Sequence, residues 1–461
     1  NRQKNHAISQ NNMLVKQYIR AIRELSPKAF VMENVSMLRS DVHRFYLDEA
    51  DNELFGQEKY EIHMQSTKLV LLDKAYMFDC AKTIARSSSA ITANIWPEDC
   101  YVSLNVVYKM SKNHQKLLKT LKKHKKKLLE YADIYADEGK KNDIESNDIA
   151  LRSYEAFSAI KQFFDEKLEA DKLKDVIEPA IMIQRMLSKS KEIFDNHLVV
   201  DKCDYAENGD LVAYIKSYAV FDYLKALLGT DSNGYEINQD VLCAADFGAP
   251  QKRKRFIVIG IKKSLTDTVQ LPIGIFSEKD YRTVQDAIGD LQNVPTVTDV
   301  AEDIGTPLKK ADDISELGKS LRDTDTLFNH IITKTRETAM ERFKAIKQGE
   351  NFHSLNDSLK TNTYTDANRT QNTIYLRLAF NQPSGTVVNV RKSMWIHPEL
   401  NRAISIREAA RLQTFPDSFI FCGSKDKQYQ QVGNAVPPIM AKAIAEKLAD
   451  QLEQIEKRFE R

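Results

Sequence analysis

The spacing of apolar residues changes from helical to extended within residues 13–40. The segment MLVKQYIRAIREL has apolar side chains at intervals of three and four residues, which predicts one buried helix face. Pro27 ends this pattern, and the apolar run AFVM after it predicts a short buried strand of a parallel sheet. The predicted helix face consists of Leu14, Tyr18, Ile19, Ile22 and Leu25.

Glu33 and Asn34 follow this predicted strand directly. Open α/β sheets bind ligands at the carboxyl ends of their strands, so a carboxylate at this point is well placed for chemistry. The same two residues would also suit the cap of a helix. The pattern alone leaves both interpretations open.

Residues 41–208 are predicted to be mostly helical and highly charged, since only two of the 15 glycines precede Gly209. Within residues 111–135, large side chains alternate at intervals of four and three residues, which is typical of a coiled-coil seam. A second amphipathic stretch near 151–197 could pack against it. The seam residues are Leu117, Leu121, His124, Leu128, Tyr131 and Tyr135. The same stretch contains Lys116, Lys119, Lys122, Lys123, Lys125, Lys126 and Lys127, which could contact a DNA backbone or simply face solvent.

The pattern changes again after residue 209. Residues 214–229 are predicted to form a helix that ends at Gly229, and GYEINQDVLCAADFG a strand and turn. The β-prone run RFIVIGI at 255–261 predicts another buried strand. Residues 263–374 are predicted to be polar and irregular. Residues 375–461 are predicted to end in a long helix, which Pro437 and Pro438 precede or open.

Composition narrows the class of protein. The formal net charge is +2, so any nucleic-acid binding must rely on local patches rather than bulk charge. There is no apolar run of about 18 residues, which argues against a membrane span. The five cysteines are scattered without a CxxC pair, which argues against a disulfide framework or a zinc site and favours a reducing cytosol.

Two short patterns carry candidate chemistry. Gln251, Arg253 and Arg255 form a Q-x-R-x-R pattern just before the predicted strand. Alternate residues of a strand share a face, so the two arginines could bind an anionic or carbonyl-rich ligand together, or merely begin a surface strand. Gly433 and Asn434 predict a turn that opens the last helix, with a positive φ at the glycine, which is either an ordinary cap or a polar-ligand site.

Taken in order, these blocks resemble the DNA cytosine-5 methyltransferase family. MENV at 32–35, GAPQKRKR at 248–255 and QVGNAVPP at 431–438 are similar to its motifs VI, VIII and X. Supporting similarity extends over RTVQDAIGDL, LRLAFNQPSGTVV and HPELNRAISIREAARLQTFPDSF, so that the resemblance covers residues 11–40 and 210–461. The block from Arg407 to Phe415 is expected to buttress the sheet and the recognition region.

The resemblance implies an α/β fold, a partial Rossmann-like S-adenosylmethionine-dependent methyltransferase fold with a helical insertion and a small target-recognition domain. The expected boundaries are 1–40, 209–262 and 375–461 for the catalytic domain, 41–208 for the insertion and 263–374 for target recognition.

The resemblance also implies site roles. The family flips a cytosine from duplex DNA, attacks C6 with a cysteine thiolate and methylates C5 from S-adenosyl-L-methionine. Glu33 matches the residue that bonds the cytosine N3 and N4 edge, Arg255 the contact to O2, and Arg253 the support of the catalytic loop. Asn434 and Val436 match positions in the methyl-donor pocket. The expected DNA contacts are Gln251, Arg336, Arg342 and Arg369.

The chain departs from the family in two places. It contains no Pro-Cys dipeptide and no Phe-x-Gly-x-Gly turn, so the nucleophile and the donor-binding turn are expected to precede residue 1. Cys80 and Cys100 are interpreted as packing or incidental cysteines. The chain is therefore expected to be a truncated enzyme, or one part of a split enzyme with a complementary subunit, and inactive alone.

Three functions remain open at this stage. The first is a restriction-modification DNA methyltransferase in a prokaryotic cytoplasm, associated with the nucleoid and not with a membrane. The second is a non-catalytic DNA-binding or regulatory subunit that retains the fold. The third is an RNA cytosine methyltransferase. It ranks lower, because residues 263–374 are compatible with a compact domain that recognises a DNA target.

Overall fold

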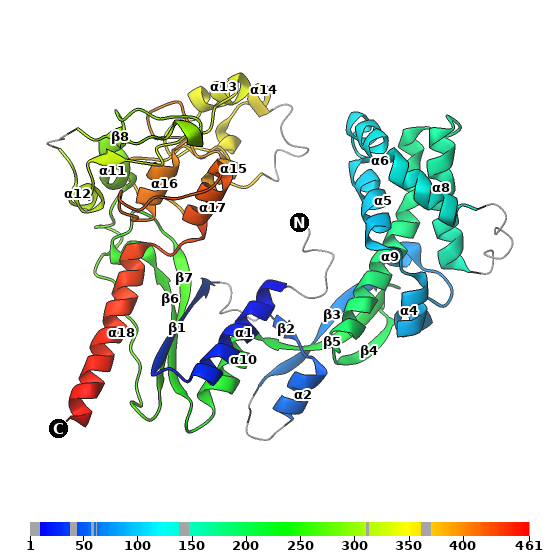
Figure 1. Ribbon diagram of the computed structural model, residues 1–461, viewed down its shortest axis with the longest axis horizontal. Coiled ribbons are helices and arrows are strands. Elements are labelled where there is room, and N and C mark those ends of the chain that lie inside the picture. The colour runs from blue at the N-terminus through cyan, green and yellow to red at the C-terminus, as the bar shows by residue number, and fades with distance from the viewer. Residues whose placement is uncertain are drawn as a thin grey trace. The chain divides into compact units, whose positions relative to one another are not determined.

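The computed structural model describes residues 10–36, 44–56, 60, 62–137, 147–309, 313–360 and 370–460, with side chains from Leu14 onward. The chain divides into two compact units, Asn1–Ser26 with Ser40–Asp231 and Pro27–Arg39 with Ser232–Arg461 (Figure 1). These units differ from the boundaries expected from the sequence. The expected first segment is split between them, and residues 209–231 belong with the helical residues that precede them.

The first unit contains an antiparallel sheet centred on β5 (Leu211–Ala219). This strand pairs with β2 (Arg44–Tyr46), β3 (Met64–Leu72) and β4 (Val200–Tyr205). The helix predicted for residues 214–229 is therefore wrong over its first six residues. Most of β5 is buried on both faces, so its apolar residues do not alternate and imitate a helical pattern. Residues 220–229 are helical and end at Gly229, as predicted, in α10 (Val220–Leu224) and a π-helical turn.

The N-terminal helix α1 (Gln10–Leu25) forms as predicted, but with a different buried face. Val15, Ile19 and Ile22 are buried, whereas Leu14 and Leu25 are 66% and 79% exposed. The helix packs against α10 in the same unit. Lys16 anchors it through ion pairs of 3.0 Å to Asp48 and 2.5 Å to Asp51.

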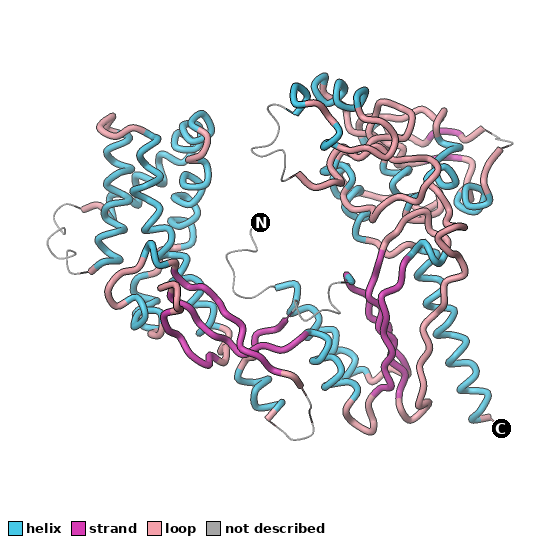
Figure 2. The backbone as a smooth tube through the Cα atoms, turned by 180° about the vertical axis from the view of Figure 1, so that it is seen from behind, coloured by secondary structure: helices cyan, strands magenta, loops and turns pink. Residues whose placement is uncertain are grey.

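Four longer helices of this unit share one core (Figure 2). They are α5 (Glu98–Met110), α6 (His114–Tyr135), α8 (Asp148–Phe164) and α9 (Leu173–Asp195). The predicted seam of α6 is confirmed at five of its six positions, since Leu117, Leu121 and Leu128 are buried in this core and Tyr131 and Tyr135 pack against it. His124 is not among the residues of this core. The shorter helical elements are α2 (Glu49–Phe55), η3 (Lys74–Tyr76), α3 (Ala81–Ala85), α4 (Ser88–Asn94) and η5 (Ala170–Lys172).

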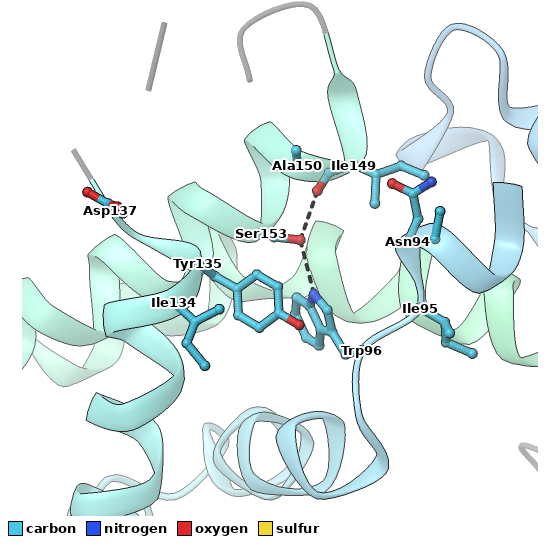
Figure 3. A pocket seen from close by; sticks show the side chains of 10 residues that line it. Asn94, Ile95, Trp96, Ile134, Tyr135, Asp137, Ile149, Ala150 and Ser153 are labelled. Carbon is cyan, nitrogen blue, oxygen red and sulfur yellow. Dashed lines mark hydrogen bonds between the residues drawn. The ribbon is translucent and has the colours of Figure 1, made fainter. Parts of the chain in front are cut away.

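A cavity of about 190 Å³ lies where α4, α6 and α8 meet (Figure 3). The Trp96 indole forms part of its lining and donates a hydrogen bond of 3.2 Å to Ser153 Oγ. Ser153 in turn donates to the Ile149 carbonyl at 2.8 Å, one turn earlier in α8. The polar atoms of Trp96 and Ser153 are thus paired within the bundle, so both side chains have a packing role there.

The second unit is built on a three-stranded sheet in the order β1 (Ala29–Val35), β7 (Lys254–Lys262), β6 (Tyr235–Cys243). The strands predicted at AFVM and RFIVIGI are confirmed, but both neighbours pair with β7 in antiparallel fashion. The expected parallel pairing is wrong for β1 within the described residues, because composition encodes burial and not strand direction. The long helix α18 (Pro438–Phe459) shares a core with β7 and opens at Pro438, as predicted.

The described residues of 263–434 are largely irregular, and their short elements pack into two further cores, the larger of which extends from Val284 to Val432. Val284 and Leu317 of the expected recognition region share that core with Trp395 and Leu412. The expected recognition and C-terminal regions therefore pack as one body. Between β6 and β7 lies η7 (Ala244–Phe247). The elements after β7 are α11 (Val284–Ile288), η8 (Gly289–Leu291), η9 (Val300–Glu302), β8 (Thr306–Pro307), α12 (Glu316–Leu321), β9 (Thr326–Leu327), α13 (Glu337–Ala345), η10 (Phe352–Ser354), α14 (Asp357–Lys360), α15 (Val390–Ser393), α16 (Ile406–Leu412) and α17 (Lys425–Asn434).

None of the helices that the structure describes combines the length and the apolar character that a membrane span requires.

Candidate functional site

Glu33 and Arg255 form an ion pair across the edge of the three-stranded sheet. Along β1, Phe30 and Met32 point into the core, while Glu33 lies on the opposite face. Glu33 stands opposite Ile257 of β7, and Arg255 lies two residues earlier on the same strand. Diagonal neighbours on one face of a sheet are within reach of long side chains. Here Arg255 Nε and Glu33 Oε1 are 2.7 Å apart, with side-chain exposures of 13% and 33%.

The partial burial of this pair shifts the pKa of both side chains. Burial raises the pKa of Glu33 above its ordinary value, and the nearby Arg255 opposes that rise without cancelling it. Burial likewise lowers the pKa of Arg255, against the opposing influence of Glu33. A carboxyl group with a raised pKa shares a proton more readily, and the guanidinium beside it supplies fixed donors. Together they can bind a planar group that offers both a ring nitrogen and a carbonyl oxygen.

Arg253 lies next to this pair in sequence but serves a different purpose. Its side chain is fully buried and donates to the carbonyl of Val387 at 2.8 Å and to that of Gly433 at 3.1 Å. The two arginines therefore do not share an exposed face as the sequence pattern suggested. Arg253 instead fastens the start of β7 to two segments more than 130 residues away.

Gln251 extends the same internal network. Its amide donates to the Leu412 carbonyl at 2.8 Å and to Gln413 Oε1 at 2.7 Å, while its oxygen accepts from the Val387 amide at 3.1 Å. The Gln251 side chain is 0% exposed and its hydrogen-bonding capacity is used internally, so this arrangement does not support the expected contact with DNA. Gln413 continues the network to the Val432 carbonyl at 2.8 Å.

The turn predicted at Gly433 and Asn434 is part of a helix. Both residues belong to the last turn of α17, and Gly433 is not among the glycines with positive φ. Glycine is required there by contact, since a Cβ at Gly433 would lie 2.5 Å from the carbonyl carbon of Val388. Asn434 is exposed and accepts a 2.6 Å hydrogen bond from Gln430. Val436 is partly buried against the core of β7 and α18.

The expected DNA contacts of the recognition region separate into three cases. Arg336 is exposed and lines a cavity of about 420 Å³ together with Lys334 and Arg391. Arg342 is only 6% exposed and donates to the Leu359 carbonyl at 2.7 Å and to the Tyr375 hydroxyl at 3.2 Å. These internal bonds do not support the expected DNA contact of Arg342. Arg369 lies outside the described residues.

A buried charged cluster that the sequence pattern did not single out organises this unit. Arg411 pairs with Asp417 and Asp290, both at 2.5 Å, and all three side chains are at most 3% exposed. Arg407 donates to the Phe328 carbonyl and to Asn329 of the recognition region, which confirms that its block buttresses that region. The sequence does carry a signal for the helix that contains Arg407 and Arg411. Ser405 and Glu408 form the capping box S-x-x-E, which marks the start of α16.

Acid is expected to destabilise this unit. Burial lowers the pKa of His397 from 6.5 to about 4, so between these values the unfolded chain binds a proton that the folded chain does not. His397 Nδ1 accepts hydrogen bonds from the backbone amides of Glu399 and Leu400. Protonation of Nδ1 would remove this acceptor and place a hydrogen atom opposite the two N–H groups. The stability that His397 contributes is complete above pH 6.5 and is lost as pH falls towards 4, by up to about 3 kcal/mol. Urea unfolding at pH 7, 5.5 and 4.5 would measure this loss.

His397→Asn is the matched control, because its side-chain oxygen can accept the same backbone hydrogen bonds but does not titrate. We expect its stability to depend less steeply on pH over this range. Burial would raise the pKa of Glu408, but Arg402 outweighs that effect and lowers it to about 2, so Glu408 adds its own loss only below its ordinary value of 4.5. Equal pH slopes for both proteins between pH 6.5 and 4.5 would contradict the role of His397.

The cysteines of the chain are all free. Cys100 is fully buried in the helical core, and burial raises the pKa of its thiol to about 12. It therefore remains protonated near neutral pH, which confirms its interpretation as a packing residue. Cys80 is exposed and precedes α3 with a φ of 63°.

Comparison with known proteins places this geometry in context. The chain matches the family C-5 cytosine-specific DNA methylase over residues 2–83 and 207–450, so residues 84–206 lie outside the match. It is 31% identical over 251 residues to type II methyltransferase M.DdeI of Desulfomicrobium norvegicum, covering 50% of this chain and 59% of that protein. It is 33% identical over 213 residues to M1.HphI of Haemophilus parahaemolyticus, covering 46% and 48%, respectively. The chain thus spans about half to three-fifths of these relatives. By its family match, the chain belongs to the C-5 cytosine-specific DNA methylases.

Proposed function

We propose that this chain contributes the base-binding part of a DNA cytosine-5 methyltransferase of the restriction-modification type. The enzyme would transfer a methyl group from S-adenosyl-L-methionine to C5 of a cytosine flipped out of duplex DNA. The observation that carries the proposal is the Glu33–Arg255 pair at 2.7 Å, because its two side chains complement one edge of a cytosine. The type II methyltransferases among the relatives support the restriction-modification context.

Each member of the pair has a distinct proposed task. The Glu33 carboxyl would bond N3 and the N4 amino group, and its raised pKa favours sharing a proton with N3. A proton at N3 stabilises the negative charge that develops when a thiolate adds to C6. Arg255 would donate to O2, where part of that charge also accumulates. Arg253 is proposed as a positioning residue, because its two carbonyl contacts hold the start of β7.

We propose that the attacking thiolate comes from sequence outside these 461 residues, either in the same polypeptide or in a complementary subunit. The chain has no Pro-Cys dipeptide, and the thiol of Cys100 is buried with a pKa of about 12. Both observations point away from a nucleophile within the chain.

We propose that Asn434 and Val436 form part of one side of a methyl-donor pocket. Asn434 is exposed at the end of α17, and Val436 is partly buried against the core of β7 and α18. S-adenosyl-L-methionine would supply the electrophilic methyl group. The glycine-rich turn that this family uses for the donor is absent from the sequence of this chain, so Asn434 and Val436 would provide only part of the binding surface.

A second candidate is a DNA-binding or regulatory subunit without catalysis. The missing Pro-Cys and Phe-x-Gly-x-Gly motifs favour it, whereas the Glu33–Arg255 pair favours the enzyme. Both candidates take duplex DNA as the partner. Arg336 remains a proposed DNA contact, since it is exposed and lines a cavity with two further basic residues.

A trapping experiment tests the proposed function. Duplex DNA containing 5-fluorocytosine retains the covalent adduct of the thiolate, and we expect this chain alone to form none. The chain expressed with its upstream coding sequence, or with a partner that carries Pro-Cys, should form the adduct and transfer radiolabelled methyl groups. Adduct formation by the chain alone would refute the external nucleophile. Failure of every combination, with DNA binding retained, would favour the non-catalytic candidate.

A further inference from the structure

Helix α6 carries a lysine surface without acidic residues. From His114 to Leu129 the helix contains no Asp or Glu, and its first turn has none. Lys119, Lys122, Lys123 and Lys126 are all exposed, and we call these four residues the lysine face. Among the described residues, no carboxylate forms an ion pair with any of them, whereas Lys127 of the same helix pairs with Asp99 at 2.7 Å.

The lysine face points away from the helical core. Successive residues of a helix are rotated by about 100°, so positions two apart lie on nearly opposite sides. Lys119 and Lys123 each follow a buried core leucine by two positions, and Lys126 precedes another by two. The core leucines in question are Leu117, Leu121 and Leu128. The face therefore forms one continuous stripe over about two turns of α6.

This arrangement differs from that of a helix surface built for solvent alone. Lysines three and four residues apart repel one another, and α6 contains four such pairs within the lysine face. The neighbouring helix α9 instead places Lys174 against Glu178 at 3.4 Å and Lys191 against Asp195 at 2.5 Å. In a chain with a net charge of only +2, concentrated repulsion of this kind fits a surface that meets a polyanion.

The spacing of the face matches a nucleic-acid backbone better than a membrane. Positions three and four residues apart are about 5–6 Å apart on a helix, so successive lysines can reach successive phosphates of one strand. A basic helix that binds lipid needs an apolar face to enter the bilayer. The apolar face of α6 is instead occupied by the core it shares with α5, α8 and α9.

We propose that the lysine face of α6 binds the phosphate backbone of duplex DNA without regard to base sequence. The inference rests on the proposed function for the identity of the partner, and it assigns a role to residues outside the family match. Such contacts raise affinity for any DNA by releasing counterions, so their signature is dependence on salt.

The test compares two variants of the full chain with equal loss of charge. The face variant carries K119Q, K122Q, K123Q and K126Q, and the control variant carries K167Q, K172Q, K174Q and K191Q. Glutamine has nearly the helix propensity of lysine, and melting curves would verify that the bundle is retained. The four control lysines lie in the same unit, and each forms an ion pair with a carboxylate.

Binding to a duplex of unrelated sequence is measured over a range of salt concentrations. Each phosphate contact contributes ~0.9 to the slope of log affinity against log salt, so four lost contacts should remove about 3.6 from that slope in the face variant. The control variant should keep most of the slope. Equal losses in both variants would attribute binding to bulk charge and overturn the inference.

The remaining outcomes separate this inference from the proposed function. An unchanged slope in the face variant, with DNA still bound, overturns the lysine-face contact and leaves the proposed function standing. Loss of binding only to phosphatidylcholine–phosphatidylserine vesicles would assign the face to a lipid surface and also overturn it. Failure of the unmodified chain to bind any duplex DNA would overturn the proposed function as well.

Discussion

Replacement of Glu33 by glutamine is expected to lower the rate of methyl transfer about 10²–10⁴-fold in a preparation that contains both this chain and the nucleophile. Glutamine cannot share a proton with the cytosine N3, so the charge that develops on thiolate addition loses its main stabilisation. The pKa of Glu33, raised by burial, is the property that the substitution removes. The measurement is transfer of radiolabelled methyl groups to duplex DNA under single-turnover conditions.

Structural damage would not account for such a loss. The Glu33–Arg255 pair is part-exposed at 33% and 13%, and pairs of this kind contribute about 0–1 kcal/mol to stability. We therefore expect the melting temperature and DNA affinity of Glu33→Gln to stay close to those of the unmodified protein. Glu236→Gln, on β6 of the same sheet, is the matched control and should retain full activity. A Glu33→Gln protein with undiminished transfer would refute the proposed role.

Replacement of Arg411 by alanine is expected to have the largest effect on stability, a loss of about 3–5 kcal/mol in the free energy of unfolding. The substitution leaves the Asp417 and Asp290 carboxylates buried without their principal partner. Arg322 at 3.3 Å from Asp290 and Arg407 at 3.9 Å from Asp417 remain, which places the expected loss towards the lower end.

The two tryptophans allow this loss to be measured in one unit of the chain. Trp96 lies in the helical core of the first unit, and Trp395 is fully buried in the core that includes Leu412 of α16. In a Trp96→Phe background, urea unfolding followed by fluorescence reports the second unit through Trp395. Arg391→Ala, which removes an exposed pair of 3.2 Å to Asp426, should cost at most about 1 kcal/mol. Equal losses for both substitutions would contradict the importance of burial.

The sequence predicted the strands β1 and β7 because both are short runs of apolar residues bounded by polar ones. It did not predict their direction, since an apolar run records burial but not the hydrogen-bonding partner. Residues 214–219 show the same limit, because Tyr214, Ile215 and Tyr218 have a spacing compatible with a helix face. Their strand conformation depends on β2, β3 and β4, which pair with β5 from distant parts of the sequence.

Among the candidate site residues, the sequence predicted the part-exposed pair better than the buried polar side chains. Glu33 and Arg255 meet as their motif positions implied, although the sequence could not supply the 2.7 Å contact between them. Gln251, Arg253 and Arg342 are polar residue types usually found at surfaces, yet their partners are internal carbonyl and side-chain oxygens. Those oxygens become available only through the tertiary fold. No local pattern distinguishes a buried arginine of this kind from one that meets DNA.

The strand order of the second unit explains how this chain can accommodate a long connection between β1 and β6. Strands β1 and β6 both run antiparallel to β7, so they are parallel to each other and the chain must cross from one end of the sheet to the other. A tight turn cannot make that crossing, and a connection of a dozen or more residues is obligatory. Beyond this minimum, each doubling of a loop adds only ~0.6 kcal/mol of closure entropy. The connection over residues 36–234 is thus a position where evolution can add or remove an entire folding unit while β1, β7 and β6 keep their register.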